Sequence, residues 1–88
     1  MKIDKILYSS HFVRSARKLP PEVREELYKR EVLFRADCFD HFLKTHKLHG
    51  RQKDHWSFSI TRAYRLLFIF VDEHTVELRD VGDHSIYQ

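Results

Sequence analysis

The chain contains little of what marks a secreted, disordered or membrane-spanning protein. One cysteine, Cys38, excludes an internal disulfide and a cysteine-based metal site, and a lone thiol suits a reducing compartment. Two glycines and two prolines in 88 residues leave no linker or low-complexity tract. The longest apolar run, LLFIFV at 66–71, is too short to cross a bilayer, and the first residues lack the apolar region of a signal peptide. We therefore expect one small cytoplasmic domain over residues 1–88.

The chain does have an excess of positive charge, and this excess lies in its middle. The formal net charge is +3, and residues 44–65 contain six Lys or Arg and three His against one acidic residue, Asp54. Such a concentration agrees with a nucleic-acid partner or an acidic protein partner. It also agrees with an ordinary solvated surface, because many basic small domains bind neither.

The N-terminal half predicts one strand followed by two helices. Residues 2–8 are short and rich in β-forming residues. Ser9 or Ser10 offers an N-cap for a helix whose apolar residues recur on one face. Pro21 must interrupt this helix, but proline is accepted in a first helical turn, so a second helix begins at once and runs to about residue 35 or 36. Two helices with so short a break form a helical hairpin.

The C-terminal half predicts a loop and three strands. Residues 37–54 show no clean period, which indicates a long loop with one helical turn near 39–43. Residues 55–61 alternate between apolar and polar side chains, as in a strand with one buried face. Residues 64–72 are apolar on both faces, as in a central strand, and residues 75–81 alternate again. Three strands joined by short turns form an antiparallel meander.

The predicted fold class is therefore α+β. The N-terminal strand, lying at an edge or between, and the meander form a four-stranded twisted sheet with the helical hairpin packed on one face. Arg65 points away from Tyr64, so it emerges on the open face if Tyr64 faces the helices. There it would meet Ser57 and Ser59 of the neighbouring strand. The basic loop and the C-terminal GDHSIY could border the same face, which suggests a site that handles phosphate.

The ordered set of segments resembles the RelE/ParE superfamily of bacterial toxin–antitoxin systems. The residues that carry the resemblance are LKTHKLHG at 43–50, WSFSI at 56–60, YRLLF at 64–68 and LRDVGDHSIY at 78–87. The helical half is similar only in pattern. The resemblance implies the RelE-like fold and a ribosome-dependent mRNA interferase that needs no metal or other cofactor.

In this family the ribose 2′-OH attacks the adjacent phosphate, and the resemblance implies roles for four residues. His84 would be the general acid, and Arg65 would clamp the scissile phosphate. Tyr87 would stack on or orient the nucleotide, and His46 falls where some relatives place a proposed base. Apart from the resemblance, we expect Gly82 to let the chain turn at the end of the last strand and so bring His84 and Tyr87 to the open face. The basic residues that we expect to hold the RNA are Lys44, Lys47, Arg51, Lys53 and Arg62.

The chain also departs from the family. Several relatives carry lysines or a histidine on the open face of the second meander strand, where this chain has Ser57 and Ser59. The identity of the base therefore stays open between His46, Lys44 and Lys47.

Each site residue has a simpler interpretation. His84 would then be a polar tail residue, Tyr87 a ring that anchors the terminus, and Arg65 a cross-strand partner of Glu77. His46, His49 and His55 would be solvated loop residues. A metal site of the histidines at 41, 46 and 49 is disfavoured, because their spacing matches no ligand motif.

The implied partners are a cognate antitoxin and mRNA in the A site of the 70S ribosome. No membrane partner is expected, and operator DNA would be met only through the antitoxin. Two other functions stay open. One is gyrase inhibition, as in the ParE branch of the superfamily, which lacks the catalytic residues. The other is a degenerate member that acts by protein binding alone, an alternative supported by the serines at 57 and 59.

Overall fold

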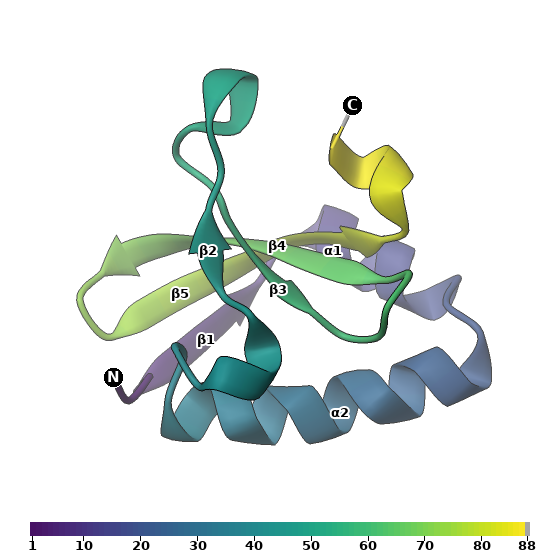
Figure 1. Ribbon diagram of the computed structural model, residues 1–88, viewed down its shortest axis with the longest axis horizontal. Helices are drawn as coiled ribbons and strands as arrows, with labels where there is room; N and C mark the ends of the chain where they lie inside the picture. The colour runs from purple at the N-terminus through teal and green to yellow at the C-terminus, as the bar shows by residue number, and fades with distance from the viewer. Residues whose placement is uncertain (88) are drawn as a thin grey trace.

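The computed structural model describes residues 1–87 and contains the predicted strand, helical hairpin and meander (Figure 1). Strand β1 (Lys5–Tyr8) leads into helices α1 (Ser10–Arg17) and α2 (Pro21–Ala36). The meander consists of β3 (Trp56–Ser59), β4 (Arg65–Asp72) and β5 (Thr75–Gly82). The remaining elements are a short strand, β2 (His46–Lys47), and three 3₁₀ turns, η1 (His41–Leu43), η2 (Gly50–Gln52) and η3 (His84–Tyr87).

The sheet has five strands rather than the four predicted, in the order β1-β5-β4-β3-β2. β1 lies at an edge, parallel to β5, and the other pairs are antiparallel. The additional strand, β2, arises inside the segment that we expected to be a loop. It has only two residues, both exposed, so it leaves no alternation of apolar and polar residues in the sequence. The α+β class and the packing of both helices on one face are confirmed.

The two helices begin as the sequence predicts. The Ser9 side chain accepts a hydrogen bond of 3.0 Å from the Phe12 N–H and caps α1. α2 starts at Pro21 without a side-chain cap, and Glu22 lies in its first turn, at the positive end of the helix dipole. Within residues 1–87, no helix combines the length and the apolar character needed to cross a membrane.

The core lies between the helices and one face of the sheet, with α2 running along that face (Figure 1). Phe34 of α2 is fully buried, and its ring centroid lies 5.0 Å from Phe58 of β3 and 4.9 Å from Phe68 of β4. Leu66 belongs to the same cluster, whereas Leu67 is buried outside it. The alternation along β4 therefore has the predicted direction, and odd-numbered residues at its start face away from the helices.

Candidate active site

Two expected site residues and two serines of the neighbouring strand lie on the open face of the sheet. His46 of β2 pairs with Ser57 of β3, and Ser59 pairs with Arg65 of β4. Cross-strand partners in an antiparallel pair point to the same side, and so do residues two apart on one strand. His46, Ser57, Ser59 and Arg65 thus lie on the side opposite α2. Arg65 meets Ser59, as expected.

The C-terminal segment is bound to this open face. The Ser57 and Tyr87 hydroxyl oxygens lie 2.7 Å apart, and the Gln52 side-chain amide donates to the Ile86 carbonyl at 3.2 Å. Figure 1 shows the β2–η2 segment and the C-terminal turn rising from the same side of the sheet. Ser57 itself is fully buried. Residues 84–87 are therefore a positioned part of the open face rather than a free tail.

Gly82 allows Ile86 to pack closely against the backbone of β5, and it does not supply a turn. It is the last residue of β5, and Gly50 is the only glycine of the chain with a positive φ. A Cβ at position 82 would lie 2.7 Å from Cγ2 of Ile86, well inside van der Waals contact. The expectation that Gly82 supplies turning freedom is wrong. Its missing side chain lets η3 pack against the end of β5.

His84 and Tyr87 lie together on η3. Their ring centroids are 5.8 Å apart with an interplanar angle of 55°, and His84 is exposed. The preceding residue, Asp83, accepts a hydrogen bond of 3.0 Å from the Ser85 N–H. This bond, helped by the Ser85 side chain, lowers the pKa of Asp83 below its ordinary value. A charged carboxylate therefore holds the turn that presents an accessible imidazole next to a phenol.

The backbone fixes the tautomer of a neutral His46. Nδ1 of its exposed ring lies 2.9 Å from the Lys44 carbonyl oxygen. A carbonyl can only accept, so Nδ1 carries the proton and donates it. Nε2 is then the nitrogen with a free lone pair, and it can accept a proton from a ligand.

Arg65 lies on the open face, and its guanidinium is held by backbone carbonyls of the β3–β4 turn. Its Nη1 donates to the Thr61 carbonyl at 2.6 Å and to the Tyr64 carbonyl at 3.2 Å, which holds the β3–β4 turn. It lines a pocket of about 370 Å³ together with Arg30, Phe42, Lys44, Ser59, Thr61 and Arg62. His46, His84 and Tyr87 do not line this pocket. The simpler interpretation of Arg65 is contradicted, because its partner on β5 is Gly82, while Glu77 lies opposite Ile69 and forms an ion pair of 2.6 Å with Arg79.

The predicted RNA-binding residues fall into two groups. Lys44 and Arg62 line the same pocket as Arg65, whereas Lys47, Arg51 and Lys53 are exposed on β2 and around η2. In the part of the chain that the structure describes, none of these five forms an ion pair with a carboxylate. Across residues 1–87, no three His, Cys, Asp or Glu side chains gather as a set of metal ligands.

Two residues of the site could not be recognised from the sequence. Ser57 appeared only as the loss of a charged family position, yet its hydroxyl holds Tyr87. Arg30 belongs to α2, and it lines the same pocket as Arg65 because α2 packs against η1, where Arg30 bonds the Phe42 carbonyl. A cross-strand register and a helix packing position both depend on tertiary structure, so no local pattern signals them.

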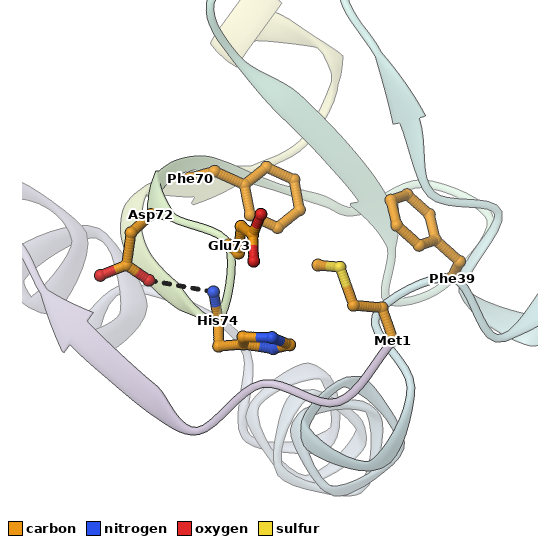
Figure 2. Close-up of a pocket in the computed structure, with 6 residues that line it drawn as sticks. All are labelled: Met1, Phe39, Phe70, Asp72, Glu73 and His74. Carbon is orange, nitrogen blue, oxygen red and sulfur yellow. Dashed lines mark hydrogen bonds between the residues drawn. The ribbon is translucent and has the colours of Figure 1, made fainter.

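A roomier pocket of about 510 Å³ lies at the other end of β5, beside the β4–β5 turn (Figure 2). It is lined by the apolar side chains of Met1, Phe39 and Phe70 and by Asp72, Glu73 and His74. Asp72 accepts a 2.9 Å hydrogen bond from the His74 N–H, which lowers the pKa of Asp72. Two carboxylates repel phosphate, and none of the predicted site residues lines this pocket. It is not the phosphate-handling site.

Comparison with known proteins identifies the fold. No protein-family profile and no curated protein sequence matches the chain. Solved structures do match over nearly all of it. YafQ from E. coli strain BL21(DE3) has a TM-score of 0.78 at 14% identity, with 98% of each chain covered. A YoeB/ParE toxin from Agrobacterium tumefaciens has a TM-score of 0.76 at 15% identity, covering 92% of this chain and 99% of that one. A chain of the RelB–RelE antitoxin–toxin complex from Methanococcus jannaschii has a TM-score of 0.71 at 18% identity, covering 93% and 95%. The chain therefore has the fold of these RelE- and ParE-like toxins.

Proposed function

We propose that the protein is the toxin of a bacterial type II toxin–antitoxin system and that it cleaves mRNA in the A site of the ribosome. The observation that carries this proposal is the Ser57–Tyr87 hydrogen bond, which holds the His84–Tyr87 pair on the open face of a toxin-like fold. An exposed imidazole beside a phenol, within a surface rich in unpaired cations, suits proton transfer on an RNA phosphate.

The proposed reaction needs no metal or cofactor, because side chains supply each proton transfer. Nε2 of neutral His46 accepts the proton of the ribose 2′-OH, and the resulting oxygen attacks phosphorus. The bond from phosphorus to the 5′ oxygen breaks, leaving a 2′,3′-cyclic phosphate. Protonated His84 gives its proton to the departing 5′ oxygen, and Tyr87 stacks on or orients the nucleotide.

Arg65 would stabilise the charge that gathers on the phosphate oxygens in the transition state. Its Nη1 is held by the β3–β4 turn, which fixes the guanidinium on the open face while other N–H donors stay available. The RNA phosphate would have to lie between Arg65 and η3. Lys44, Lys47, Arg51, Lys53 and Arg62 would hold the flanking RNA.

The proposed regulator is a cognate antitoxin. The E. coli DinJ–YafQ toxin–antitoxin complex, another structural neighbour, has a TM-score of 0.75 at 16% identity. An antitoxin that covers the positive middle of this chain should present acidic and apolar residues on a segment that folds upon binding. Operator DNA would be reached only through that antitoxin, and the site of action would be the cytoplasm.

Induced expression in bacteria tests the proposal. We expect growth arrest with loss of full-length mRNA, abolished by His84→Ala and by Arg65→Ala but not by Lys29→Ala, which removes an exposed cation of α2. Mutants of His84 and Arg65 that stay as toxic as the parent would refute the site assignment. Toxicity with damaged DNA and intact mRNA would favour gyrase inhibition instead.

A further inference from the structure

Four cations from separate parts of the chain line one pocket of about 370 Å³. They are Arg30 of α2, Lys44 at the end of η1, and Arg62 and Arg65 at the β3–β4 turn. Phe42, Ser59 and Thr61 complete the lining, and among the residues that the structure describes no carboxylate lines it. We call this site the basic pocket. Four positive charges in a lining that is otherwise neutral attract an anion strongly.

Arg30 is held in place before any ligand arrives. Its Nη1 donates to the Phe42 carbonyl at 2.6 Å, and its Nε bonds Glu26 at 3.3 Å. Its side chain is only 23% exposed. Glu26 is the one counter-charge that any of the four cations has within residues 1–87. The remaining N–H donors of this fixed guanidinium can therefore receive an anion with little loss of side-chain freedom.

Lys44 has an unusual backbone. Its φ of 54° and ψ of 41° are left-handed, and within residues 1–87 it is the only residue other than glycine with a positive φ. Residues other than glycine, asparagine and aspartate seldom adopt this conformation, and such outliers concentrate at functional sites. The left-handed turn ends η1 and places the Lys44 side chain at the basic pocket, two residues before β2 begins.

Phe42 adds an aromatic surface to the same pocket. The residue is 61% exposed, whereas Phe34, Phe58 and Phe68 are fully buried. The ring lies 4.3 Å from that of His41 at an angle of 32°, so one stacked pair borders the cations. Single-stranded nucleic acids are bound by this combination, with cations along the backbone and an aromatic ring under a base.

We propose that the basic pocket binds a backbone phosphate of single-stranded RNA next to the one that is cleaved, with the adjacent base stacked on Phe42. The proposal rests on the proposed function, because RNA is taken as the substrate. It concerns a second position, since neither His46 nor His84 lines the pocket, and Arg65 would lie between the two phosphates.

Binding of a fluorescent RNA oligonucleotide with 2′-O-methyl groups, which cannot be cleaved, tests the proposal by anisotropy at several salt concentrations. The double substitution Lys44→Gln/Arg62→Gln should weaken binding about tenfold and reduce the salt dependence of log K by about 1. The control Arg14→Gln/Lys29→Gln removes the same charge from exposed positions on the helices and should change both quantities much less. Phe42→Ala should weaken binding about tenfold without changing the salt dependence.

Equal losses in the two double variants would overturn the proposal, and so would unchanged binding in Phe42→Ala. Inorganic phosphate, added at about 10 mM, separates the two sources of the anion. If it displaces the RNA from the wild type and Phe42→Ala has no effect, the pocket is a site for free phosphate and the RNA proposal fails.

A cleavage assay on mRNA-programmed ribosomes separates this proposal from the proposed function. If the wild type does not cleave but binds RNA through the basic pocket, the nuclease function fails and the RNA site stands. If the wild type cleaves and the Lys44→Gln/Arg62→Gln variant binds and cleaves as well, the site fails and the nuclease function stands.

Discussion

Replacing Ser57 by alanine removes the contact that holds the C-terminal turn on the sheet. The serine side chain is fully buried, and its hydroxyl oxygen lies 2.7 Å from that of Tyr87. A neutral hydrogen bond of this kind contributes about 0.5–1.5 kcal/mol net to stability. Tyr87 is only half-buried, so its freed hydroxyl can return to water, and we expect a loss of about 1 kcal/mol in the free energy of unfolding. In a domain of this size, that loss lowers Tm by about 4–8 °C.

A double-mutant cycle isolates the bond. Tyr87→Phe removes the same contact from the other side, so Ser57→Ala/Tyr87→Phe should cost no more than either single change. The expected coupling is about 0.5–1.5 kcal/mol from urea unfolding followed by Trp56 fluorescence. Ser59→Ala is the matched control, since Ser59 shares the strand and the face, whereas the bonds to the C-terminal turn come from Ser57 and Gln52. Additive losses, or equal losses at 57 and 59, would show that the Ser57–Tyr87 bond does not hold the C-terminal turn.

Three further changes probe the anchoring of the turn and the core. Gly82→Ala puts a Cβ 2.7 Å from Ile86 Cγ2, so we expect the free energy of unfolding to fall by about 1–3 kcal/mol and the amides of η3 to exchange faster. Wild-type exchange rates in this variant would contradict the packing role of Gly82. Phe34→Ala empties the centre of the core and should cost about 3–5 kcal/mol in urea unfolding, whereas a loss under about 1 kcal/mol would place the core elsewhere. The Ser85 N–H lowers the pKa of Asp83 below its ordinary value. The stability from this bond is therefore complete above the pKa of the unfolded state and is lost as pH falls through the pKa of the folded state. Exchange of the Ser85 amide should therefore rise in acid, beyond its ordinary pH dependence, in the wild type but not in Asp83→Asn.

The elements with a strong period were predictable from the sequence. The alternation of residues 55–61, the doubly apolar run at 64–72 and the prolines at 20 and 21 correspond to β3, β4 and the break between the helices. The short strand β2 was not predicted, because its two residues form a strand only by pairing with β3. The same pairing decides that His46 lies next to Ser57, a relation that no residue spacing contains.

The site was predictable as a face of the sheet but not as a set of contacts. The period of β4 placed Arg65 on the open side, and its cross-strand neighbour is Ser59, as expected. The direction of its guanidinium depends on the carbonyls of the β3–β4 turn, which the sequence does not locate. Likewise, the family resemblance suggested His84 and Tyr87 as site residues, while the contacts of Ser57 and Gln52 that hold η3 appear only in the fold.

The nuclease function can be tested with purified protein and mRNA-programmed ribosomes. We expect a cut in the A-site codon that leaves a 2′,3′-cyclic phosphate. We also expect His84→Ala to reduce the rate by at least about a hundredfold while keeping the wild-type Tm. Intact mRNA with the wild-type protein, or cleavage by His84→Ala at the wild-type rate, would contradict these expectations.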